Sequence, residues 1–116
     1  MARALITMLR TAKRGELIEI RTLIAHPMET GYRPGEDGWV RPRDLIRRFS
    51  CHYEGERSDG GRSDDLVFSA ELFPAVAANP LISFFTVATA SGTLRFSWEG
   101  DNGFAQTERV ALSVLP

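Results

Sequence analysis

Apolar and polar side chains alternate along most of this chain with a period of two residues. The clearest case is segment 94–98, where Leu94, Phe96 and Trp98 alternate with Arg95 and Ser97. Such alternation places one set of side chains on a buried face of a strand and the other set in solvent. This pattern, together with short β-branched and aromatic runs, predicts seven strands, at residues 4–9, 18–24, 49–53, 66–72, 82–88, 94–99 and 109–114.

Turn signals separate several of these strands, as hairpins require. They are Lys13-Arg14-Gly15-Glu16, Ser91-Gly92 and Gly100-Asp101-Asn102-Gly103. We expect Ser91-Gly92 to supply the positive φ of a tight turn. No stretch keeps a 3.6-residue period, so the crossover helices of a parallel fold are not expected. The sequence therefore predicts an all-β, antiparallel β-sandwich of about seven strands in two sheets.

Three segments fall outside this rhythm. Residues 26–43 are rich in glycine and proline and predict a long irregular connection, a kind of loop that is usually functional or disordered. Residues 54–65 predict a flexible surface loop. The segment Phe73–Pro80 predicts one or two helical turns, because Pro74 suits a first helical position and Pro80 prevents continuation.

Composition and charge narrow the class of protein. The 116 residues suffice for one core, so we expect a single domain over residues 1–116. The 14 basic and 15 acidic side chains nearly cancel, which argues against a general nucleic-acid binder. No window approaches the roughly 20 apolar residues of a membrane span. The apolar stretch at the N-terminus is too short for an export signal.

The single cysteine offers little chemistry. Adjacent side chains of a regular strand point to opposite faces, so Cys51 and His52 form a nucleophile–base pair only if a bulge intervenes. Cys51 shares its face with Phe49 and Tyr53, which favours a buried, inert thiol. A thiol enzyme using Cys51 remains an alternative. His26 and His52 lack the short spacings of metal motifs, so neither a metal nor a cofactor is predicted.

Four arginines, Arg41, Arg43, Arg47 and Arg48, concentrate positive charge after the long loop. They could bind an anion or steer an acidic partner. The alternative is a solvated strand end, the common situation for arginine.

The long loop also carries a specific motif. The stretch His26-Pro27-Met28-Glu29-Thr30-Gly31-Tyr32 resembles the HPMETGYR segment of the SoxZ family, the Z subunits of a sulfur-oxidation carrier. The resemblance continues, in order, through Thr11–Glu16, Ile18–Ile24, Ala70–Ala75, Ala78–Phe85 and Ser91–Trp98. It covers nearly the whole chain. The chain departs from the family in a longer Glu54–Asp65 loop and in Pro34–Val40.

The resemblance implies an immunoglobulin-like sandwich with no catalytic residue of its own. It implies a heterodimer with a SoxY subunit, whose C-terminal cysteine arm holds sulfur intermediates during the oxidation of thiosulfate to sulfate. It further implies transient docking to other sulfur-oxidation enzymes and a periplasmic location reached by co-export with SoxY. This chain has no Gly-Gly-Cys-Gly-Gly arm, so it corresponds to the partner of the carrier subunit. A homodimer of the isolated chain stays open, since loss of the partner would expose an apolar face.

The partner-binding residues that we expect are His26, Met28, Glu29, Thr30, Gly31, Phe84 and Phe85. In the alternative interpretation, His26-Pro27 sets the exit of a strand and Met28 fills a gap in the core. Of the two phenylalanines, one should enter the core, while the other faces a partner or lies under the Phe73–Pro80 turn. Phe96 and Trp98 are predicted to lie in the core. A second functional hypothesis is a SoxYZ-like carrier module that serves another periplasmic dehydrogenase.

Overall fold

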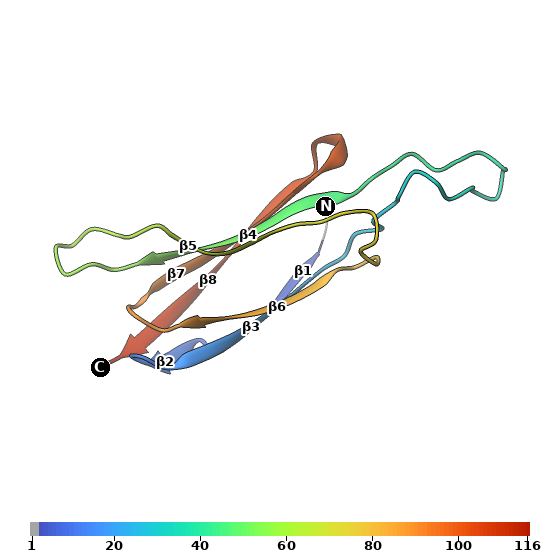
Figure 1. The fold of residues 1–116 in the computed structure, drawn as a ribbon. Helices are drawn as coiled ribbons and strands as arrows, with labels where there is room; N and C mark the ends of the chain where they lie inside the picture. Colours follow the sequence, from blue (N-terminus) through green and yellow to red (C-terminus); the bar gives the residue numbers. More distant parts are fainter. Residues whose placement is uncertain (1–2) are drawn as a thin grey trace.

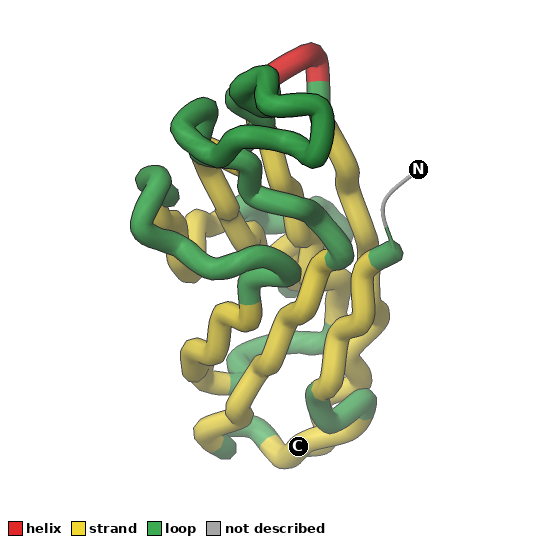
Figure 2. Tube along the Cα trace, turned by 90° about the vertical axis from the view of Figure 1, so that its right-hand side faces the viewer, coloured by secondary structure: helices red, strands yellow, loops and turns green. Residues whose placement is uncertain are grey.

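Alternating burial along the strands builds two facing sheets, as the computed structural model shows for residues 3–116 (Figures 1 and 2). These residues form eight strands and one short 3₁₀ turn. They are β1 (Ala4–Thr7), β2 (Thr11–Lys13), β3 (Leu17–Ile24), β4 (Ile46–Gly55), β5 (Asp65–Glu71), β6 (Leu81–Val87), β7 (Gly92–Gly100), η1 (Asp101–Gly103) and β8 (Ala105–Leu115). The predicted immunoglobulin-like β-sandwich is confirmed.

The two sheets have the strand orders β1-β3-β6 and β2-β8-β7-β4-β5. Within residues 3–116, every strand pair is antiparallel except β2 with β8, which is parallel. The sequence predicted one strand over residues 4–9 and missed β2. The chain instead leaves the three-stranded sheet after Thr7 and joins the edge of the other sheet at Thr11.

The core lies between the sheets and is rich in aromatic rings. Phe49 of β4 packs against Trp98 of β7 and Phe84 of β6, with ring centroids 5.3 and 5.8 Å apart. Phe68 and Phe84 stack at 4.9 Å. Phe96 and Trp98 are fully buried, as predicted. Burial of such large rings supplies much of the apolar driving force for folding.

Two local predictions were wrong. Gly92 does not adopt a positive φ; it begins β7, where an added Cβ would lie 2.2 Å from the carbonyl oxygen of Glu54. A close approach of two strands, rather than a turn, therefore requires glycine there. Residues 73–80 form turns without a helix. Within this segment, the N–H of Val76 donates a turn-type hydrogen bond to the carbonyl of Phe73 at 3.0 Å. Asn79 has a left-handed φ of 52°, which a helix would not allow.

The loops gather at the two ends of an elongated molecule that measures 60 × 22 × 21 Å (Figure 1). One end holds the long connection between β3 and β4, with isolated bridges at Glu29–Asp44 and Pro34–Val40. The connection between β4 and β5 lies at the opposite end. It is shorter than the predicted 54–65 loop, because β4 continues to Gly55 and a bridge joins Glu56 to Arg62.

Candidate partner-binding site

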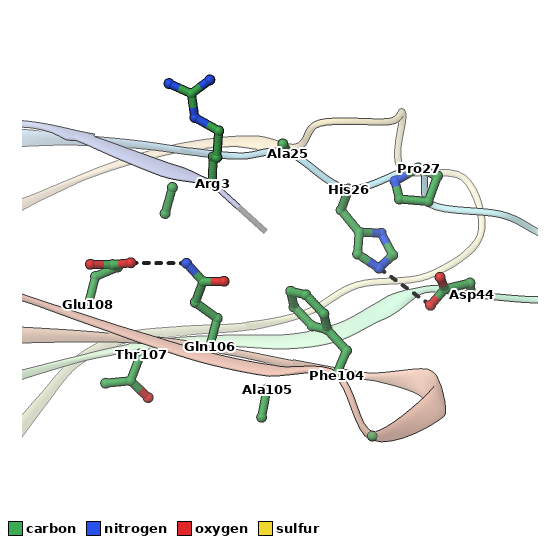
Figure 3. Close-up of a pocket in the computed structure, with 12 residues that line it drawn as sticks. Arg3, Ala25, His26, Pro27, Asp44, Phe104, Ala105, Gln106, Thr107 and Glu108 are labelled. Carbon is green, nitrogen blue, oxygen red and sulfur yellow. Dashed lines mark hydrogen bonds and ion pairs between the residues drawn. The ribbon is translucent and has the colours of Figure 1, made fainter. Parts of the chain in front are cut away.

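His26 anchors the start of the long connection just beyond β3. Its Nδ1 accepts a hydrogen bond from the backbone N–H of Met28 at 3.0 Å, and its Nε2 lies 3.4 Å from Oδ1 of Asp44. Because Nδ1 acts as the acceptor, the proton of the neutral ring resides on Nε2 and faces the carboxylate (Figure 3). The ring of Phe104 packs edge-on against the imidazole at 5.0 Å. The histidine is thus fixed on three sides.

Asn79 ties the backbone of His26 to the connection between β5 and β6. Oδ1 of Asn79 accepts the His26 N–H at 2.9 Å, and the Asn79 N–H donates to the His26 carbonyl at 2.8 Å. This contact was not predicted from the sequence. An asparagine before a proline is a turn signal that could have marked Asn79, although its partner is 53 positions away in the sequence.

Met28 belongs to the core. Its side chain is 4% exposed, and its Sδ accepts a hydrogen bond from the backbone N–H of Ile46 at 3.3 Å. The residue has a φ of 51°, which is uncommon for a side chain of this size. Met28 therefore fills a gap in the core, as in the alternative interpretation, and its side chain is not on the surface where a partner would meet it.

Glu29, Thr30 and Gly31 shape the root of the loop. Glu29 exchanges two backbone hydrogen bonds with Asp44, at 2.8 and 2.9 Å. Its carboxylate pairs with Arg33, whose guanidinium holds the pKa of Glu29 below the usual range. Thr30 Oγ1 accepts the N–H of Tyr32 at 3.2 Å. Gly31 has a φ of 89°, and an added Cβ would lie 3.1 Å from Cβ of Arg43, so glycine suits this position.

Asp101, in the turn between β7 and β8, forms ion pairs with two of the four arginines, Arg43 and Arg47. Its Oδ1 accepts Nε of Arg47 at 2.6 Å, and its Oδ2 lies 3.3 Å from Nε of Arg43. Oδ2 also accepts the backbone N–H of Leu45 at 3.1 Å. The Arg47 hydrogen bond contributes most to lowering the pKa of Asp101. Because Arg43 and Arg47 have an internal counter-ion, the arginine cluster offers less free charge to an anion than its sequence suggests.

The outer surface of the β1-β3-β6 sheet is unusually apolar. Phe84 points into the core, while its neighbour Phe85 points outward. The exposed apolar residues of this surface, which we call the apolar face, are Leu5, Leu17, Leu23, Leu81, Phe85 and Val87. Their exposed fractions correspond to roughly 600 Å², the upper end of what the largest patch on a typical monomer reaches.

Strand register organises the apolar face into rows. Leu5, Leu23 and Leu81 are direct neighbours across β1, β3 and β6, and Leu17 lies opposite Val87. Between these rows, Arg21 pairs with Glu19 at 3.4 Å. The outer surface of the five-stranded sheet has the opposite character. There Arg95 pairs with Glu54 at 3.1 Å and with Asp64 at 3.5 Å, beside Ser97 and Thr107.

A cleft of about 860 Å³ opens between β1 and β8, beside His26 (Figure 3). Ala4, Ala25 and His26 line it from one sheet, and Phe104, Gln106 and Glu108 from the other. A smaller hollow of about 360 Å³ adjoins Leu5 and Leu23 on the apolar face. The cleft and the hollow share Arg3, Ala4 and Ala25, so they lie on the two sides of β1.

Cys51 is fully buried, and burial raises the pKa of its thiol to about 12. A register shift does occur between Cys51 and His52 in the pairing with β5. In the pairing with β7, however, Cys51 faces Phe96 and His52 faces Arg95 in regular succession. Their side chains therefore stay on opposite faces, so the imidazole of His52 is not placed to activate the thiol.

Neither a metal cluster nor a spanning helix is found in the described part of the chain. Residues 3–116 contain no group of three or more histidine, cysteine, aspartate or glutamate side chains placed to hold a metal ion. Over the same residues, no helix has the length and apolar character needed to cross a membrane.

The sequence matches the model of one protein family, and the structure is similar to those of several solved β-sandwich proteins. A family model described as "Sulphur oxidation protein SoxZ" matches residues 6–111. A superoxide reductase (neelaredoxin) from Ignicoccus hospitalis aligns with a TM-score of 0.75 at 16% identity, covering 97% of this chain and 79% of that one. The sulfur carrier protein SoxY from Chlorobium limicola f thiosulfatophilum aligns with a TM-score of 0.65 at 12% identity, again covering 97% and 79%. No curated protein matches at a significant level. At these identities, the structural likeness concerns the fold alone.

Proposed function

Because the chain belongs to the SoxZ family and is thereby a SoxYZ sulfur-oxidation subunit, we propose that it acts without catalysis, as the scaffold of a heterodimer. The second subunit is a SoxY-like protein whose C-terminal cysteine arm carries sulfur intermediates from thiosulfate to sulfate. The complex works in the periplasm and docks transiently to the enzymes that process the bound sulfur.

The apolar face is the observation that carries this proposal. Its six apolar residues together expose roughly 600 Å², most of the 800 Å² or so that each partner buries in a stable complex. The outer surface of the five-stranded sheet is mainly polar, although Leu66 is exposed there, and it offers a weaker drive to association. We therefore assign the apolar face, with Phe85 on its edge strand β6, to the SoxY-like subunit. In an isolated chain the same face would favour a homodimer.

The motif residues have a different role in this proposal. His26 and Met28 are buried and hold the root of the long connection in one conformation. Glu29, Thr30 and Gly31 lie beyond them and set the direction in which the loop leaves the sandwich. A loop on so rigid a base gives docking enzymes a fixed surface. Phe84 supports Phe85 from the core side of β6.

A scaffold of this kind has a chemical purpose. Thiols and persulfides exchange and oxidise readily when they move freely in solution. A subunit beside the arm limits where the bound sulfur can go. Cys51 is unsuited to carry that sulfur itself, because its thiol is buried and protonated. This geometry counts against the thiol-enzyme alternative.

Native mass spectrometry of the chain purified from its source cells, grown on thiosulfate, tests the proposal. The expected result is a one-to-one complex with a small protein that carries extra sulfur mass on a C-terminal cysteine. A carrier serving another periplasmic dehydrogenase would give the same heterodimer without a thiosulfate-dependent sulfur adduct. A lone monomer, or sulfur bound to Cys51, would contradict the proposed function.

A further inference from the structure

The strand β8 has one open edge. Along residues 105–112 it pairs with β7, whereas β2 covers its other side only at Ser113, Val114 and Leu115. The N–H of Ser113 donates to Arg10 O, on the β2 side, at 2.9 Å. Since backbone groups of alternate residues point to the same edge of an antiparallel strand, Thr107, Arg109 and Ala111 direct their N–H and C=O groups to this open edge. Among residues 3–116, these groups have no backbone partner there.

The inner side of the same strand turns polar where the edge is open. Val110 and Leu112 are buried between the sheets, but Gln106 and Glu108, in the same phase of β8, line the cleft. Gln106 Nε2 donates to Glu108 Oε1 at 2.9 Å (Figure 3). Because these inward positions carry polar side chains, the space between β1 and β8 is not filled by apolar packing. The 860 Å³ cleft occupies this space.

The cleft offers mainly hydrogen-bond acceptors. Its carboxylates are those of Glu108 and the partly exposed Asp44, and the Gln106 carbonyl adds another acceptor. The one ring donor, Nε2 of His26, is already directed at Asp44. Arg3 also borders the cleft, but its guanidinium points away from Glu108 and Gln106 (Figure 3). The interior therefore favours a cationic side chain and disfavours an anionic one.

Self-association through this edge is disfavoured. If two copies paired β8 with β8 around the middle of the open stretch, Glu108 would lie opposite Glu108, or Arg109 opposite Arg109. Like charges directly opposite each other destabilise a sheet, and charged side chains are a common protection of exposed edges.

We propose that an extended segment of the SoxY-like subunit adds to β8 as a strand along residues 105–111, with a lysine or arginine facing Glu108. This inference rests on the proposed function and names the second place where the partner engages the chain. The position of β1 agrees with this inference. The hollow at Leu5 and the cleft share three lining residues, so a partner seated on the apolar face adjoins the cleft that β8 borders. Strand addition gives affinity through backbone hydrogen bonds, and the cleft gives selectivity through charge.

Hydrogen–deuterium exchange of the chain, alone and co-expressed with its SoxY-like subunit, tests this inference. In the isolated chain the amides of Thr107, Arg109 and Ala111 should exchange rapidly; in the complex they should be slowed by about tenfold or more. Glu108→Lys should abolish this protection. Glu99→Lys is the matched control, because it makes the same exchange at an exposed position of β7 that does not line the cleft, and it should leave the protection intact.

The outcomes separate the two proposals. If native mass spectrometry finds the heterodimer but these amides exchange as fast as in the isolated chain, the strand addition is wrong and the proposed function stands. Protection that is already present in the isolated chain and rises with its concentration would assign the edge to a second copy instead. If the protection persists in Glu108→Lys, the proposal that a lysine or arginine of the partner faces Glu108 is wrong. If no heterodimer forms, both proposals fail.

Discussion

Phe84 and Phe85 are consecutive in β6 but face opposite environments. Phe84 is 6% exposed and stacks on Phe68 at 4.9 Å, whereas Phe85 is 56% exposed and lies opposite Glu19 on the outer surface of the sheet. The sequence predicted that one ring would enter the core, and this is confirmed. The two consecutive positions of β6 thus place one ring in the core and the other on the surface of the sheet.

Phe84→Ala should lower the free energy of unfolding by about 3–5 kcal/mol, because it opens a cavity among aromatic rings. Phe85→Lys should change it by no more than about 0.5 kcal/mol, since the new ammonium lies in solvent near Glu19. The same Phe85→Lys variant should weaken binding of the SoxY-like subunit by about 30-fold or more. Urea unfolding and calorimetric titration measure the two effects. Equal affinity of Phe85→Lys and the unmodified chain would remove the apolar face as the interface.

Two variants of His26 separate its hydrogen bond from its packing. His26→Ala removes the acceptor for the Met28 N–H and the contact with Phe104, and should cost about 2–4 kcal/mol of unfolding free energy. His26→Asn keeps an acceptor close to the position of Nδ1 and should recover part of that loss. Urea midpoints compare the two. An equal loss in both would mean that packing on Phe104, and not the hydrogen bond, holds the loop root.

Asp101 should make stability depend on pH. Its pKa is held low in the folded chain by Arg47, the Leu45 N–H and Arg43. A carboxyl group with a lowered pKa stabilises the folded state above its unfolded pKa of about 4, and this contribution disappears as pH falls through the folded value. Asp101→Asn should therefore be less stable than the unmodified chain at neutral pH, and the difference should shrink below about pH 4.

Urea midpoints measured across pH 2–8 follow this difference. Asp65→Asn, which alters an exposed carboxylate at the start of β5, is the control and should show little difference at any pH. If the gap between Asp101→Asn and the unmodified chain stayed constant down to pH 2, the charge of Asp101 would not be what stabilises the turn.

Cys51 should be unreactive until the chain unfolds. Its thiol is fully buried and has a pKa of about 12, so a thiol reagent at pH 8 should modify it only in the presence of denaturant. The raised pKa also means that stability should fall as pH rises above about 9, because the unfolded thiol ionises there and the folded one does not. Cys51→Ala should preserve thiosulfate-dependent loading of the partner. Loss of loading in a folded Cys51→Ala variant would revive the thiol-enzyme hypothesis.

Local patterns of the sequence were sufficient for much of the fold. The period of two predicted where most strands run and which of their side chains are buried, as Leu94, Phe96 and Trp98 illustrate. Burial of alternate side chains is a property of a single strand, so it can be derived without knowing the neighbours. The strand β2 was not predicted, because its three residues are too few to show an alternation of apolar and polar side chains. It forms through pairing with Ser113–Leu115.

The candidate site was predicted less completely. Glycine and proline marked the long connection, and the motif drew attention to His26–Gly31. The partners that fix these residues, Asp44, Asn79 and Phe104, were not predicted, since they come from three separate segments that only the packed sandwich brings to one end. The apolar face was missed for a similar reason: Leu5, Leu23 and Leu81 become one surface only through strand register.

By itself, the sequence determined the fold class, the burial of Cys51 and the family, because alternation and a near-continuous motif are local features of the chain. Tertiary structure alone decided that Met28 belongs to the core, that Asp101 neutralises two arginines, and that β8 keeps an open edge beside an acidic cleft. Each of these depends on which segments meet in space. A residue's burial, counter-ion and unpaired backbone groups are properties of its neighbours, and those neighbours are chosen by the fold.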